Sequence, residues 1–131
     1  MKTKQEYITY WTTQAQDDWE AVDVLFSGKK FLQSLFFAHL CVEKICKALW
    51  ILSNESNIPP KTHNLIYLLS QTTLQPTDAQ SEFLLELNRF QLEGRYPEYI
   101  SQMHLLGNKS FTQNTIEKTN EIRIWLLSKL Q

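Results

Sequence analysis

The pattern of apolar and polar positions predicts helices along the whole chain and no strands. Its strongest segment is residues 31–52, FLQSLFFAHLCVEKICKALWIL, which has six polar residues and neither proline nor glycine. A run of this length and composition predicts an α-helix. A surface helix needs only one apolar stripe, whereas this segment is apolar over most of its circumference. We therefore expect it to be a central helix, covered by its neighbours on several sides.

The segment before the central helix predicts a first amphipathic helix. Thr3 and Glu6 form a capping-box pattern, and apolar residues then recur at steps of three and four up to about Phe26. Gly28 is expected to end this helix in the left-handed conformation. Because only two residues then precede the central helix, the two helices should be antiparallel.

The second half of the chain predicts shorter elements. A short third helix should begin with Thr62 or Asn64 as its N-cap. A second capping box, from Thr77 to Gln80, should open a fourth helix that ends near Gly94. These elements predict an all-α fold, an up-down four-helix bundle with one additional short helix.

Residues 93–109, EGRYPEYISQMHLLGNK, predict a long loop rich in Arg, Tyr and His. Pro97 is expected to keep the preceding residue out of a helix, and loops of this length are often functional. The last helix should begin near Thr112, with Phe111 and Ile116 forming a hydrophobic staple.

Length and charge restrict the possible classes of protein. The 131 residues predict a single domain spanning 1–131. With 13 basic and 14 acidic residues, any anion site must be local. The N-terminus lacks the apolar region of a secretory signal, and Glu43, Lys44 and Lys47 make a membrane span costly, by about 2.5–3.5 kcal/mol for each central Lys. We expect a cytoplasmic protein with no membrane partner.

Several chemistries are disfavoured by residue types and spacing. The chain has three glycines, so it lacks a glycine-rich phosphate loop or a dinucleotide fingerprint. Cys41 and Cys46 would point about 140° apart on a helix, which predicts buried reduced thiols. No His-Glu-x-x-His motif is present. We therefore predict neither a metal site nor a cofactor.

A charged seam on the central helix is the first candidate site. His39, Glu43 and Lys47 stand four residues apart and share one edge, with Lys44 beside them. One interpretation is an intrahelical Glu43–Lys47 pair at the edge of the bundle. The other is a cleft or a dimer seam in which these side chains bind a phosphate.

Further candidates lie outside the central helix: Lys61, His63, Arg95, Tyr96, Tyr99 and His104. The segment around His63 is either a plain helix cap or a site of anion capture beside Lys61. The aromatic and basic residues of the predicted loop either attach it to the bundle or stack on a base and contact a phosphate. Together with the seam, they predict a groove for a nucleotide or anion formed by Lys44, Lys47, Lys61, His63, Arg95 and Tyr96.

Four features follow one another along the chain: residues 11–25 with Ala15, Asp18 and Ala21; residues 36–50, FFAHLCVEKICKALW; residues 61–69, KTHNLIYLL; and residues 87–99, LNRFQLEGRYPEY. Taken together, these features resemble the HEPN domain family. The resemblance implies an up-down bundle and frequent homodimers. It also implies roles around nucleotides, RNA or partner nucleotidyltransferases in bacterial defence and toxin–antitoxin operons. An independent sign of an interface is that Trp50, Ile124, Trp125 and Leu127 lie outside the main core stripes.

Many HEPN members are metal-independent ribonucleases with an Arg, a polar residue directly after it, and a His separated from the Arg by four to six intervening residues. This sequence departs from that pattern, because Tyr96 and Pro97 follow Arg95 and eight residues separate it from His104. Arg89 has no His in range. The expected function is therefore a non-catalytic, dimeric HEPN module that binds a nucleotide or a partner such as a nucleotidyltransferase. The alternative is a ribonuclease that uses Arg95 and His104.

Overall fold

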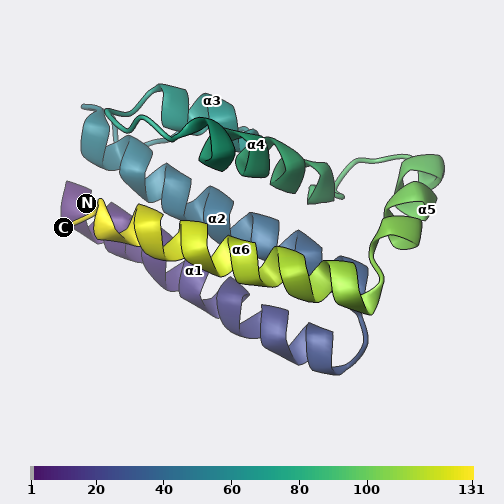
Figure 1. Ribbon diagram of the computed structural model, residues 1–131. Helices are drawn as coiled ribbons and strands as arrows, with labels where there is room; N and C mark the ends of the chain where they lie inside the picture. Colours follow the sequence, from purple (N-terminus) through teal and green to yellow (C-terminus); the bar gives the residue numbers. More distant parts are fainter. Residues whose placement is uncertain (1) are drawn as a thin grey trace.

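The computed structural model describes residues 2–131, and this part of the chain contains helices and no strands. The all-α prediction is therefore confirmed for these residues. Three long helices lie side by side: α1 (Lys4–Ser27), α2 (Phe31–Ser53) and α6 (Lys109–Ser128) (Figure 1). Between α2 and α6 the chain forms α3 (Leu65–Ser70), α4 (Asp78–Leu87), the 3₁₀ helix η1 (Asn88–Phe90) and α5 (Pro97–Leu106). Within residues 2–131, no helix has both the length and the apolar character that a membrane span needs.

α1 and α2 form an antiparallel hairpin, as the short connection predicts. The capping box of Thr3 and Glu6 is present at the start of α1. The predicted left-handed Gly28 is wrong, because Gly28 has φ −83° and Lys29 has φ 61°. The amide of Lys30 donates to the carbonyl of Leu25 at 2.8 Å, which is the six-to-one bond of a Schellman turn. The turn is thus formed one residue later than predicted.

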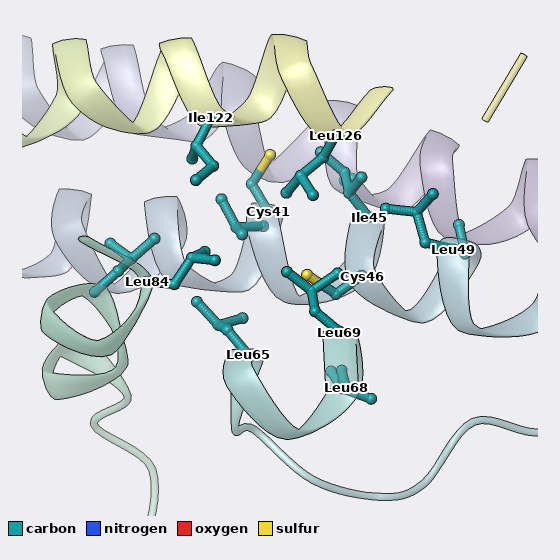
Figure 2. Close-up of a cluster of buried hydrophobic side chains, with 14 of the residues drawn as sticks. Cys41, Ile45, Cys46, Leu49, Leu65, Leu68, Leu69, Leu84, Ile122 and Leu126 are labelled. Atoms are coloured by element: carbon teal, nitrogen blue, oxygen red, sulfur yellow. The ribbon is translucent and has the colours of Figure 1, made fainter. Parts of the chain in front are cut away.

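α2 is the central helix, as predicted, since it packs against α1, α3 and α6 and contains more buried residues than any other helix of residues 2–131. Figure 2 shows its residues Cys41, Ile45, Cys46 and Leu49 surrounded by leucines and isoleucines of α3, α4 and α6. Both cysteines are free and buried, as the sequence predicts. Burial raises the pKa of the Cys41 thiol to about 12, and it raises the pKa of Cys46 as well, so neither thiol is activated as a nucleophile.

The chain between α2 and α6 forms short elements instead of one long helix. Asn64 caps α3, and the capping box of Thr77 and Gln80 opens α4, both as predicted. However, α4 ends at Leu87 instead of near Gly94, and η1 follows it. The reason is visible at Asn88, whose side-chain oxygen accepts a hydrogen bond from the amide of Leu65 at 3.1 Å. This contact turns the chain toward the start of α3, and Phe90 is fully buried directly afterwards.

The prediction of a continuous loop over residues 93–109 is wrong, because α5 occupies most of it. Pro97 is the first residue of α5, a position where its missing N–H costs no hydrogen bond. The last helix begins at Lys109 with Asn108 as its cap, not near Thr112. The predicted staple therefore does not form, and the amide of Phe111 donates to Asn108 Oδ1 at 2.9 Å instead. Residues 2–131 thus contain three long and three short α-helices in place of the predicted four-helix bundle with one additional short helix.

Candidate functional site

The carboxylate of Glu43 is the centre of the candidate site. Its side chain is buried near the middle of α2, with only 5% of its surface exposed. Its Oε2 accepts a hydrogen bond from Lys47 Nζ at 3.0 Å, and its Oε1 accepts one from His63 Nδ1 at 2.8 Å. The predicted Glu43–Lys47 pair is therefore confirmed. The additional bond to His63 connects α2 to the segment before α3.

His39 lies one turn before Glu43 on α2 and is fully buried. Its Nε2 is 3.0 Å from the carbonyl oxygen of His63. Because a carbonyl only accepts, Nε2 must carry the hydrogen in this contact. The other nitrogen, Nδ1, has no hydrogen-bond partner and is 3.9 Å from Glu43 Oε1. Burial lowers the pKa of His39, against an opposing effect of the Glu43 charge, so the ring is neutral at pH 7.

The two ring nitrogens of His63 have different surroundings. Its Nδ1 donates to Glu43, whereas 46% of its side chain is exposed. Its Nε2 is 3.8 Å from Oε2 of Glu93, a side chain that is 64% exposed. A ring whose one nitrogen is fixed by a buried carboxylate presents the other in a defined direction. His63 can therefore offer Nε2 to a ligand or a substrate.

Lys44 is the next residue after Glu43, but the structure places it elsewhere. Its Nζ is 2.7 Å from Oδ2 of Asp18 on α1. This contact is an ion pair without hydrogen-bond geometry, since that oxygen has no hydrogen-bond partner. Lys47 is also engaged, because it pairs with Glu43 and lies over the ring of Trp11 at 5.2 Å. Two of the three lysines of the predicted groove, Lys44 and Lys47, are thus paired with carboxylates of their own chain.

The remaining predicted residues are more accessible. Lys61 and Arg95 are exposed, and neither forms an ion pair within residues 2–131. The guanidinium of Arg95 stacks on Tyr99 at 4.3 Å, and its Nε donates to the carbonyl of Gln91 at 3.1 Å. Tyr96 is 80% exposed. In the same segment of the chain, Glu93 is the residue that faces His63.

Arg95 and His104 lie near opposite ends of α5, farther apart than one helical turn. Arg95 precedes α5 by two residues, and His104 lies in its last turn. At a rise of about 1.5 Å per residue, His104 is roughly 10 Å along the helix axis from Pro97. The prediction that both residues lie on an irregular loop is wrong for His104, but the separation of the two residues remains.

Sequence analysis missed three partners in this site. Glu93 was not recognised as a neighbour of His63, Gln91 was not assigned a role, and Asp18 was not connected to Lys44. The contacts of Glu93 with His63 and of Asp18 with Lys44 join residues far apart in the chain, for which one sequence carries no signal. The contacts of Gln91 are local, with Glu93 and Arg95. Among residues 2–131, no three His, Cys, Asp or Glu side chains form a group suited to a metal ion.

The helical fold and the polar cluster at one edge of α2 define a small helical domain with a candidate site for anions. The family model described as HEPN domain matches residues 8–130, nearly the whole chain. The chain therefore belongs to the HEPN domain family, whose members are nucleotide- or RNA-related modules and commonly dimerise. No curated protein and no solved structure matches the chain significantly.

Proposed function

We propose that this chain is a non-catalytic HEPN module that binds the phosphate group of a nucleotide or of single-stranded RNA. The binding surface, called the rim below, consists of Lys61, His63, Arg95 and Tyr96. The observation that carries the proposal is the His63 ring: Glu43 fixes it at Nδ1 at 2.8 Å, 46% of the side chain is exposed, and Nε2 makes no hydrogen bond within residues 2–131. In the imidazolium form both ring nitrogens carry a hydrogen, so Nε2 can donate to an anion while Nδ1 donates to Glu43. A donor oriented in this way loses little conformational freedom when it binds an anion.

The other members of the rim supply charge and stacking. Arg95 offers a planar fork of donors that suits a phosphate, and its stacking on Tyr99 limits its freedom. The exposed Tyr96 ring is free to stack on a base, a contact worth about 1–3 kcal/mol in single-strand binding. In this proposal Lys47 supports the site through its pair with Glu43, whereas Lys44, which is paired with Asp18, takes no part in it.

Binding should be tested with two probes at low salt: a fluorescein-labelled single-stranded RNA by anisotropy and ATP by calorimetry. We expect Arg95→Ala to weaken binding about tenfold, which is 1.4 kcal/mol, and His63→Ala to do the same. Lys118→Ala is the matched control, because this exposed lysine of α6 lies outside the rim. Binding should also weaken as salt rises. If neither probe binds, or if the rim variants bind as well as the parent, the proposal is wrong.

The alternative is a metal-independent ribonuclease that uses Arg95 and His104. Acid–base cleavage needs a His within hydrogen-bond reach of the reacting oxygen and a cation near the phosphate. The length of α5 separates the two residues in one chain, although a dimer can pair Arg95 of one chain with His104 of the other. We expect no cleavage of single-stranded RNA in buffer with a chelator. Cleavage that both Arg95→Ala and His104→Ala abolish would establish the alternative.

We further propose that the chain forms a homodimer and that a nucleotidyltransferase is its protein partner, as the family suggests. Of the four apolar residues named for an interface, Ile124 is 55% exposed, and Trp125 and Leu127 are half-buried. Trp50 is different: it is buried, and its Nε1 donates to Gln71 Oε1 at 2.7 Å, so it belongs to the fold and not to an exposed patch. Light scattering at tens of micromolar tests the dimer, and a monomer at that concentration would contradict it.

A further inference from the structure

His63 is faced by one carboxylate at each ring nitrogen, and the two carboxylates differ. Glu43 is buried, is bonded to Lys47 and lies at hydrogen-bond distance from Nδ1. Glu93 is 64% exposed and lies 3.8 Å from Nε2, beyond hydrogen-bond distance. The first contact is therefore part of the fold, whereas the second is a weak, solvent-screened contact that another anion can replace.

Gln91 determines where Glu93 and Arg95 lie. The Gln91 side chain is only 7% exposed, and its Oε1 accepts a hydrogen bond from the amide of Glu93. Its Nε2 donates to the Glu93 carbonyl at 3.4 Å, and its own carbonyl accepts from Arg95 Nε at 3.1 Å. A buried polar side chain thus holds the backbone of Glu93 while leaving its carboxylate exposed. The carboxylate can turn away from His63 without any change in the fold.

We propose that Glu93 is an internal competitor for the phosphate site, since its carboxylate covers the Nε2 position of His63 that a ligand phosphate takes. This inference rests on the proposed function and names how the same site is regulated. When a phosphate binds, the Glu93 side chain turns into solvent, and the negative charge facing His63 is exchanged for that of the ligand. The shared ligand chemistry is a phosphate group, carried by a free nucleotide or by an RNA strand.

The test is the affinity of Glu93→Gln for inorganic pyrophosphate, ATP and the labelled RNA, each measured separately. We expect the variant to bind about three- to tenfold more tightly than the parent, because removing one nearby negative charge favours an anion by roughly that factor. Glu98→Gln is the matched control. It removes the same charge from an exposed position in the first turn of α5, and we expect less than about a twofold change.

A double variant separates direct competition from a general effect of charge. In a His63→Ala background, Glu93→Gln should no longer increase affinity, because the two residues act on the same ligand group. An equal gain with and without His63, or no gain from Glu93→Gln while Arg95→Ala still weakens binding, would overturn this inference and leave the proposed function standing. If the parent binds none of the three probes, both fail. Tighter binding of pyrophosphate and ATP alone would assign the site to free nucleotides, and tighter binding of RNA as well would assign it to any phosphate.

Discussion

Lys44 and Lys47 lie three residues apart on α2, yet their ion pairs differ in kind. Lys44 pairs with Asp18 of α1, and within residues 2–131 neither side chain forms a second ion pair. This ion pair, called the closed pair below, joins two helices and connects to no other charged side chain. Lys47 pairs with Glu43, and that carboxylate also holds His63, which in turn faces Glu93 at the surface. The comparison shows that a charge on a central helix does not by itself mark a site. The network around Glu43 is a candidate because it ends at His63, an exposed side chain whose Nε2 makes no hydrogen bond within residues 2–131.

Glu43→Gln should have the largest effect on stability. It leaves Lys47 and His63 without their shared carboxylate in a position that is almost fully buried. Breaking one partner of a buried pair costs about 3–5 kcal/mol of unfolding free energy. Urea denaturation of parent and variant measures this difference. A loss below about 1 kcal/mol would mean that the network contributes little to the fold.

Asp18→Asn tests the closed pair in the same way and should cost less. The side chain of Lys44 is 21% exposed, compared with 12% for Lys47, so its ammonium group can move into water when the carboxylate is lost. We expect a loss of roughly 1–2 kcal/mol, between the values for exposed and buried pairs. Ligand affinity should be unchanged, since Asp18 lies outside the Glu43 network. A larger loss of stability than that of Glu43→Gln would reverse the comparison.

The buried His39 should make stability depend on pH. Its folded pKa is lowered from the ordinary 6.5 by burial, so the unfolded chain binds a proton that the folded chain does not. The stability that the neutral His39 ring contributes to the folded state is fully present above pH 6.5, the ordinary pKa, and is lost as the pH falls toward the lowered pKa of the folded state. One such proton gives at most about 1.4 kcal/mol per pH unit.

The matched variant for this pH effect is His39→Gln, which keeps an N–H donor for the carbonyl of His63. Denaturation curves at several pH values below 6.5 should show a shallower loss of stability for the variant than for the parent. Other titrating groups are common to both proteins, so the difference between the slopes reports on His39. Parallel slopes would show that His39 does not titrate between the two states.

Much of the fold could be predicted from local patterns. The caps at Thr3, Asn64 and Thr77 and the apolar character of α2 are all encoded within a few neighbouring residues. α5 was missed because a proline can either break a helix or occupy its first position. We expected the first role for Pro97, and the structure shows the second. The interruption after α4 was missed because Asn88 bonds to Leu65, and this contact is not local.

The candidate site was predictable only in part, for the same reason. The spacing of His39, Glu43 and Lys47 is a local helical pattern, and it correctly indicated one polar edge and the Glu43–Lys47 pair. The bond from His63 to Glu43 spans 20 residues and depends on how α3 packs against α2. Adjacent positions on α2 also diverge by about 100°, which is why Lys44 lies with Asp18 and not in the seam.

The most direct test of the central claim is nitrogen NMR of the imidazole rings, with and without ATP. If Glu43 orients His63 for a phosphate, the Nδ1 of His63 should carry a hydrogen at pH 7. Its Nε2 signal should shift on addition of ATP, while the signals of the buried His39 stay where they are. An Nδ1 without a hydrogen, or a shift at His104 in place of His63, would contradict the account.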